Sequence, residues 1–238
     1  MATKTTTRNR IAGNGADRTA KDKDGFVVRV EIPALQQGEA TLMLIGDRPL
    51  LVNNKLNVAQ GIAEQYGGVG GKAGTVKKPS ATPDEQYAHA FYTLLDSNHA
   101  APHEKARYGV PVSGIKKCAC SAIRTTGITD NTTIGLIAKS FWVLGDSGGL
   151  CLLKYDRLER DVRPVNIGSG QKTVPQMRYR PMFHGWSIRL RVKFNRMVIT
   201  EDQLVNLFMH AGQYIGLCEM RAEKKQGECG GFVVEGSS

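Results

Sequence analysis

The feature that most constrains the fold is the segment 186–194, in which apolar and polar side chains alternate with a period of two. Successive side chains of a β-strand point to opposite faces of a sheet, so this pattern predicts a strand with one buried face. The polar side of the strand carries Arg189, Arg191 and Lys193. The rest of the chain must therefore cover the apolar side, while the basic side is left for solvent or for an anionic partner.

This strand lies in an interval without acidic residues. Between Val162 and Thr200 there are eight basic side chains and no Asp or Glu. Over the whole chain, 32 Lys and Arg face 22 Asp and Glu, which gives a formal net charge of +10. Such a balance favours an anionic partner, with nucleic acid ahead of an anionic membrane surface. The alternative is that these basic side chains pair with acids from elsewhere in the chain.

We predict that the basic strand lines a groove for the nucleic-acid backbone, with further arginines at its rim. Two lysines at a helix start and two in the C-terminal Gly-rich segment would hold the backbone from other sides, although a solvated helix face and a solvated hairpin tip are about equally expected for them. One tryptophan would stack on unpaired bases, although a place in the core is about equally expected. The candidate side chains are Lys116, Lys117, Arg178, Arg180, Trp186, Arg189, Arg191, Lys193, Arg196, Lys224 and Lys225.

The chain divides into an arm and one domain. Residues 1–25 carry six basic and three acidic side chains and few bulky apolar ones, so we predict a mobile basic arm. Residues 26–238 are expected to form a single α+β nucleic-acid-binding domain. Predicted helices are residues 54–66, 83–96, 113–124 and 201–211, two of which begin with capping boxes, Thr82 with Glu85 and Thr200 with Gln203.

Strands are expected at residues 26–32 and 41–45, which are separated by a turn at Gly38, and at residues 186–194, 214–218 and 232–234. Residues 138–144 and 150–155 are expected to form a β-hairpin. Loops are predicted at residues 67–78 and 156–175. In the helix 113–124 the predicted buried stripe is Ile115, Cys118, Ala119 and Ala122.

Three motifs that suggest chemistry have simpler interpretations. Residues 145–149 (GDSGG) match the nucleophile signature of trypsin-like serine proteases around Ser147, but the upstream histidines lack that family's sequence context, so a turn is favoured. Residues 66–73 (YGGVGGKA) lack the first glycine and the Ser or Thr of a phosphate-binding loop. The cysteines of residues 118–120 and the histidines of residues 99–103 do not have zinc-site spacing. We expect no catalytic residue, no metal and no cofactor.

The five cysteines are an odd, scattered set, which is typical of reduced thiols. The apolar runs fall short of the roughly 18 residues that a membrane span needs, and residues 1–24 have no apolar core of a secretory signal. A cytosolic protein is therefore expected.

Four motifs together resemble a family of uncharacterised phage-encoded proteins, over about residues 28–234. They are residues 45–53 (IGDRPLLVN), 108–117 (YGVPVSGIKK), 178–181 (RYRP) and 211–216 (AGQYIG). The Ser and Lys at the helix start and the terminal Gly-rich loop also resemble the repeat-associated (RAMP) superfamily, which includes the backbone subunits of CRISPR effector filaments. That resemblance implies a ferredoxin-like, RNA-recognition-motif-like core that holds nucleic acid by its backbone and stacks head to tail.

We therefore expect an α+β fold, with a ferredoxin-like (RRM-like) core and an inserted helical and β-hairpin region. The expected function is sequence-independent binding of single-stranded RNA or DNA by a multimerising, non-catalytic backbone protein of phage or CRISPR-like type, in the host cytosol if it is phage-encoded. The alternative from another class is a viral shell protein whose basic arm neutralises a genome, and a serine protease comes third.

Overall fold

A computed structural model of the chain describes residues 20–21, 27–28, 33–54, 82–167, 174–224 and 227–236. Two units are present, Met1–Leu35 and Gln36–Ser238. In the first, β1 (Ala20–Lys21) pairs antiparallel with β2 (Val27–Val28). The predicted arm and the strand 26–32 are described only at these residues. Nearly all of the predicted helix 54–66, and the whole of the predicted loop 67–78, lie outside the described residues.

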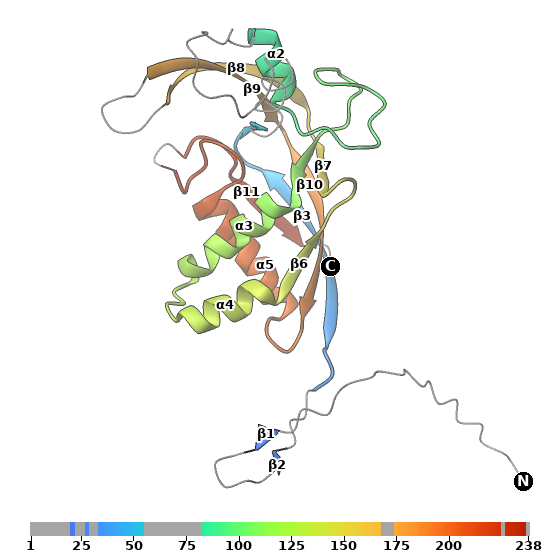
Figure 1. The fold of residues 1–238 in the computed structure, drawn as a ribbon, viewed down its shortest axis with the longest axis vertical. Coiled ribbons are helices and arrows are strands. Elements are labelled where there is room, and N and C mark those ends of the chain that lie inside the picture. Colours follow the sequence, from blue (N-terminus) through green and yellow to red (C-terminus); the bar gives the residue numbers. More distant parts are fainter. Residues whose placement is uncertain are drawn as a thin grey trace, which may run out of the picture. The chain divides into compact units, whose positions relative to one another are not determined.

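The second unit is a mixed α/β structure built on antiparallel sheets (Figure 1). In its main sheet the order is β11 (Phe232–Gly236), β3 (Gln37–Gly46), β10 (Ser187–Asn195), β7 (Leu150–Lys154) and β5 (Gly109–Pro111). A further strand, β6 (Phe141–Leu144), also pairs with β10. The predicted strands 186–194 and 232–234 are confirmed as β10 and β11.

The expected hairpin of residues 138–144 and 150–155 is wrong. β6 and β7 each pair with β10, at residues 191–194 and 187–188 respectively, so they follow one another along the same edge of β10. The five residues between β6 and β7 form a tight turn beside this edge. In the turn, the Ser147 and Leu150 backbones are hydrogen-bonded to each other. Two strands joined by a short turn-forming segment look alike in sequence whether they pair with each other or with a third strand.

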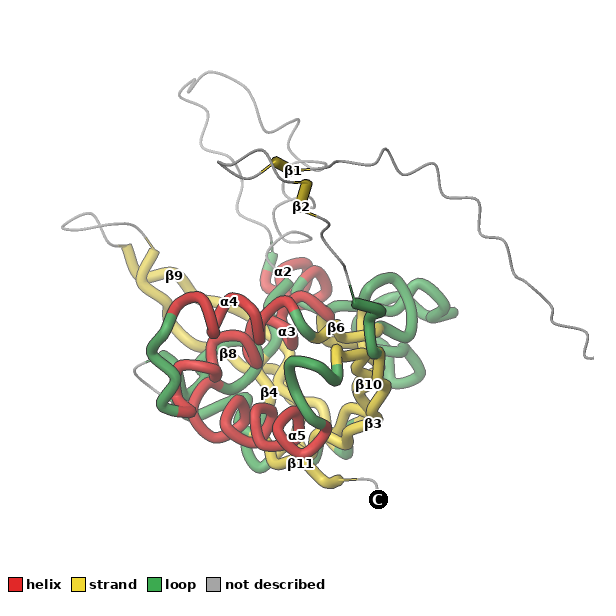
Figure 2. Tube along the Cα trace, turned by 90° about the horizontal axis from the view of Figure 1, so that it is seen from below, coloured by secondary structure: helices red, strands yellow, loops and turns green. Residues whose placement is uncertain are grey.

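Three helices lie together on one side of the main sheet, α3 (Val112–Ala122), α4 (Asn131–Lys139) and α5 (Glu201–His210) (Figure 2). The predicted buried stripe of α3 is confirmed, and its residues share one core cluster with the apolar side of β10. The Thr200 capping box of α5 is confirmed. α4 was not predicted, although Asp130 accepts hydrogen bonds from the backbone and hydroxyl of Thr133 and so marks the start of the helix.

A second sheet consists of β4 (Leu50–Leu51), β9 (Val174–His184) and β8 (Arg157–Ile167), in the order β4-β9-β8. The helix α2 (Pro83–His89) packs on β9 and begins with the predicted capping box, but it ends well before residue 96. The Arg160 guanidinium lies 5.0 Å from the ring centroids of Tyr87 in α2 and Tyr179 in β9. The loop predicted at residues 156–175 is wrong at residues 157–167 and 174–175, because β8 and the first residues of β9 form a long two-stranded ribbon. Residues 168–173 lie outside the described residues.

Two glycines were misinterpreted as turn or stop signals. Gly38 lies within β3, opposite Phe194, and a Cβ there would come 2.7 Å from the Phe194 ring. Gly212 does not end the helical segment, since a π-helical turn, Ala211–Ile215, follows α5 in place of the predicted strand 214–218. A Cβ at Gly212 would lie 1.9 Å from the Phe232 carbonyl oxygen. Both glycines permit a close approach between elements rather than a change of direction.

All five thiols are free. Within the described ranges, every helix is too short or too polar to cross a bilayer.

Candidate nucleic-acid interface

The side of the main sheet that faces away from α3 and α5 carries the basic side chains predicted for the groove. Arg189, Arg191 and Lys193 are exposed, while the residues between them in β10 are fully buried. Alternate residues of a strand are about 6.6 Å apart, so the three cations form a regular row. We call this exposed row the basic face. Its existence follows from the period of two that the sequence displays.

The neighbouring strands add both charge and apolar surface to this side. On β3, the residues opposite Arg189, Arg191 and Lys193 are Met43, Thr41 and Glu39. On β7, the exposed Lys154 lies opposite Ser187 and extends the row of cations by one. On β11, the exposed Glu235 lies opposite Met43. The positive charge is therefore concentrated along β10 and β7, while one acid, Glu39, lies opposite Lys193 and the other, Glu235, lies on the edge strand β11.

The basic face has little internal compensation. In the interval from Val162 to Thr200, the ion pairs formed by described residues belong to Arg163, Arg180 and His184. Of the three cations of β10, Arg191 makes one long contact of 3.5 Å to the carbonyl oxygen of Gly145. One acid of the sheet, Glu39 on β3, lies opposite a cation of the row, Lys193, while Arg189 and Arg191 face Met43 and Thr41. The remaining repulsion between like charges would be relieved by an anion.

An exposed ring lies beside the basic face. Trp142 in β6 is directly opposite Lys193, and 43% of its surface is exposed, whereas its neighbours Phe141 and Val143 are buried. From α3, the Lys116 Nζ lies 5.8 Å from the Trp142 ring centroid and 5.5 Å from that of Phe141. Trp142 was not among the predicted site residues. The alternation of residues 141–144 contained the signal, because it directs one of two adjacent rings outward.

Trp186, the ring predicted to stack on bases, is in the core and cannot do so. Its side chain is fully buried, and its Nε1 donates a hydrogen bond of 2.7 Å to the Arg48 carbonyl oxygen. The ring packs on Gly46, where a Cβ would come 2.2 Å from Nε1. A buried indole with a satisfied N–H has no face free for a ligand.

Arg180 is also unavailable, because it is buried among acids. Its guanidinium pairs with Asp161 at 2.7 Å and with Glu219 at 2.8 Å, and the Asp161 side chain is only 3% exposed. Arg163 pairs with the same Asp161 at 2.6 Å and with Glu228 at 2.9 Å. For these two arginines the alternative considered from the sequence, pairing with acids from elsewhere in the chain, is correct.

The other candidates for the rim of the groove do not lie on β10. Arg178 is half-buried in β9, and Arg196 is exposed in the turn after β10, where its backbone N–H donates to the Gln36 carbonyl oxygen. Lys224 is exposed, and Lys225 lies outside the described residues. Neither arginine shares the strand that carries the basic face.

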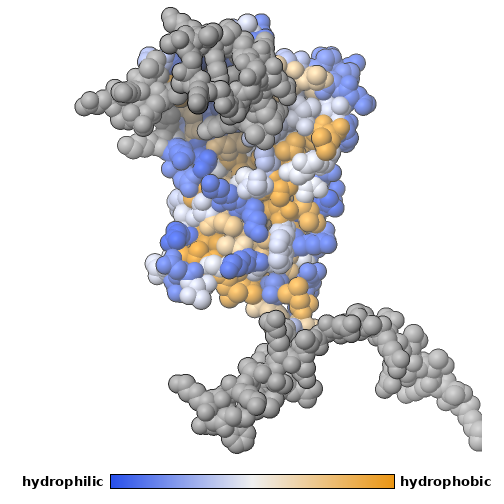
Figure 3. All heavy atoms as spheres, viewed as in Figure 1, coloured by the Kyte–Doolittle hydropathy of each residue, from blue (hydrophilic) through white to orange (hydrophobic). Residues whose placement is uncertain are grey.

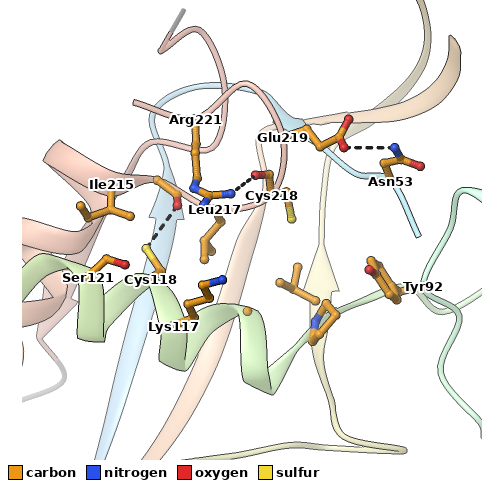
Figure 4. A pocket seen from close by; sticks show the side chains of 14 residues that line it. Asn53, Tyr92, Lys117, Cys118, Ser121, Ile215, Leu217, Cys218, Glu219 and Arg221 are labelled. Atoms are coloured by element: carbon orange, nitrogen blue, oxygen red, sulfur yellow. Dashed lines mark hydrogen bonds between the residues drawn. The ribbon is translucent and has the colours of Figure 1, made fainter. Parts of the chain in front are cut away.

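The two adjacent lysines of α3 diverge. Lys116 reaches the rings of β6, whereas Lys117 lines a hollow of about 240 Å³ between α3 and the segment 215–221 (Figure 4). Across this hollow, Arg221 donates a hydrogen bond to the Cys218 carbonyl oxygen, and Asn53 donates one to Glu219. The Cys118 thiol donates to the Gly216 carbonyl oxygen at 3.2 Å, and burial raises its pKa to about 12. The hollow is lined by two cations, an acid and two cysteines, Cys118 and Cys218, and burial raises the pKa of both thiols to about 12.

Ser147 lies in the turn between β6 and β7. Gly148 and Gly149 in this turn have φ values of 58° and 73°, which favour glycine. The ring nitrogens of described histidines hydrogen-bond to residues 105, 125 and 159, and none of them to Ser147. The GDSGG motif is therefore accounted for by a turn.

The arrangement offers exposed cations and one exposed ring rather than a reactive cluster. In the part of the chain that the structure describes, no group of three or more His, Cys, Asp or Glu is placed to hold a metal ion. Hydrophobic and hydrophilic side chains are interspersed on the side of the molecule seen in Figure 3. The chain matches no protein-family model, and no curated protein is similar to it.

Proposed function

We propose that the protein binds single-stranded nucleic acid through the basic face, by contacts to the backbone and without catalysis. One observation carries the proposal: Arg189, Arg191 and Lys193 project from alternate positions of a strand whose opposite side is core. Cations held in this way meet successive phosphates, which carry no sequence information. Binding that does not depend on sequence follows.

A single strand is the better partner than a duplex for a surface of this kind. The cations form one straight row along β10, which suits the backbone of one extended strand. An exposed ring beside the cations also suits unpaired bases, which expose a π face that duplex bases bury by stacking.

We further propose that the core is ferredoxin-like. The strands β11, β3, β10 and β6 lie side by side in this order, and all neighbouring pairs are antiparallel. In chain order the elements are β3, α3, β6, β10, α5 and β11, with α4, β7 and the β8–β9 ribbon as additions. The βαββαβ sequence supports this assignment, as does the resemblance to RAMP-type backbone subunits. A multimerising backbone protein of phage or CRISPR-like type is the role that we propose.

Fluorescence anisotropy with labelled strands of about 20 nucleotides tests the proposed function. We expect unrelated DNA and RNA sequences to bind with similar affinities, a duplex to bind more weakly, and all affinities to fall as salt rises. Failure of every strand to bind at about 50 mM salt, or a requirement for one sequence, would refute the proposal. Deletion of residues 1–25 should leave most of the binding, whereas a shell protein that neutralises a genome with its arm would lose it.

A further inference from the structure

We propose that Trp142 is the residue on which a base of the bound strand stacks. This inference rests on the proposed function and adds a contact to a base, whereas the row of cations contacts phosphates. The ligand is an unpaired nucleobase, purine or pyrimidine, because an indole face stacks on either.

The position of Trp142 in the sheet sets its distance from the cations. Residues directly opposite in an antiparallel pair have Cβ atoms about 4.5–5.5 Å apart, so the indole rises beside the side chain of Lys193. Arg191 is the diagonal neighbour, since its partner in β6 is Leu144, two residues beyond Trp142. A base on this ring would therefore have the backbone of its own nucleotide within reach of β10.

A third cation lies near the ring from the helix side. Lys116 Nζ is 5.8 Å from the Trp142 centroid, within the range of a cation–π contact. The ring thus stands between Lys193 of β10 and Lys116 of α3. A nucleotide is the ligand whose chemistry matches this arrangement, with a flat apolar base for the indole and an anionic phosphate for the flanking lysines.

The exposure of Trp142 is not explained by packing. Phe141 and Val143 supply the core contacts of β6, with exposures of 0% and 7%, while Trp142 keeps 43% of its surface in solvent. The other tryptophan of the chain, Trp186, is fully buried. A protein partner that seeks an apolar patch would meet a ring with Lys193 and Lys116 beside it, so an anionic strand is the occupant that these two cations favour.

The two tryptophans allow a direct test by intrinsic fluorescence. Titration with an unlabelled oligothymidine of about 20 nucleotides should quench the emission of Trp142 and leave that of Trp186 as an internal reference. In Trp142→Leu the quenching should disappear. The affinity for the same strand should fall by about 5- to 140-fold, the equivalent of the stacking of one base. Trp142→Phe should recover part of the affinity.

A strand of the same length made of abasic nucleotides separates stacking from any general defect. Trp142→Leu should bind this probe as well as the unchanged protein does, because the phosphates remain and the bases are gone. Tyr214→Leu is the matched control, since Tyr214 is an equally exposed ring, at 54%, after α5. It should leave both affinities unchanged.

The outcomes distinguish the inference from the proposed function. If strands bind but Trp142→Leu neither loses quenching nor weakens binding of the normal strand, the stacking assignment is refuted and backbone binding stands. Equal losses for the normal and the abasic strand would also refute stacking. If the unchanged protein binds no strand, the proposed function itself fails.

Discussion

Neutralising the basic face should weaken the salt dependence of strand binding by a calculable amount. The perturbation is the triple variant Arg189→Gln, Arg191→Gln, Lys193→Gln, which keeps the strand length and all buried side chains of β10. Each phosphate contact to a single strand contributes about 0.7 to the slope of log affinity against log salt. Three contacts therefore account for about 2.1 of that slope. When the salt concentration rises fourfold, these three contacts lower the affinity of the unchanged protein by about 18-fold. The variant should lack this part of the decrease.

The same substitutions should hardly affect folding. All three side chains are exposed, and such surface changes usually alter the free energy of unfolding by less than about 0.5 kcal/mol each. For a domain of this size, 1 kcal/mol shifts the melting temperature by about 2–4 °C. Thermal unfolding should therefore remain within a few degrees of that of the unchanged protein, and some loss of repulsion within the row would offset the change.

Anisotropy titrations over about 50–200 mM salt give the slope, and circular dichroism gives the melting temperature. The control Lys105→Gln, Arg124→Gln, Lys139→Gln removes the same charge from exposed sites outside the main sheet. It should keep the slope within the error of the measurement. An unchanged slope in the first variant, or an equal decrease in the control, would show that the basic face does not contact phosphates.

Light scattering with a strand of about 40 nucleotides should show more than one protomer per strand, and a strict one-to-one complex at saturating protein would contradict the multimerising role. Ser147→Ala should change neither stability, within about 0.5 kcal/mol, nor binding, and labelling of Ser147 by a fluorophosphonate probe would overturn its assignment as a turn residue. Arg180→Ala should lower the free energy of unfolding in urea by about 3 kcal/mol, since it leaves the buried Asp161 with fewer partners, and a change below about 1 kcal/mol would refute that role. Burial raises the pKa of Cys118 and of Cys151 from 9.0 to about 12, so above pH 9 the unfolded chain loses these thiol protons first. Stability should then decrease by about 1.4 kcal/mol per pH unit for each thiol up to about pH 12, and the double variant to Ala should show a shallower decrease in urea titrations at pH 8 to 11.

Elements whose signals are local could be predicted from the sequence. The alternation of β10, the two capping boxes and the buried stripe of α3 each depend on residues within one strand or one turn. The β8–β9 ribbon lacked such a signal, because charged residues and prolines interrupt its pattern. Its buried arginine, Arg180, is neutralised by Asp161 and Glu219, which are distant in the sequence. A π-helical turn after α5 could not be foreseen, since it depends on Phe232 approaching Gly212 across the core.

In the candidate site, too, only the residues with a local sequence signal could be predicted. Arg180 and Arg189 are indistinguishable in a list of basic residues, yet one is buried and the other exposed. Arg180 pairs with Asp161 and Glu219, which lie 19 and 39 residues away in the chain, so no local pattern reveals the pairing. The prediction that Trp186 stacks on bases is wrong, and the exposed ring is Trp142, because exposure of a ring depends on which side of its strand the core lies.

Packing of the core determines which side chains of β10 are exposed and which residues of the neighbouring strands they lie opposite. A shift of β10 by one residue relative to β3 and β6 would bury Arg189, Arg191 and Lys193 and expose the apolar residues between them, at a large cost in free energy. The register that places Lys193 opposite Trp142 is therefore fixed by the same packing that stabilises the fold. Backbone atoms held in a central strand need no ordering when a ligand binds, so the entropy lost on binding is confined to the side chains and the strand. A preorganised row of this kind suits a protein that must bind any sequence, since its affinity comes from the fixed spacing of charges and not from adaptation to particular bases.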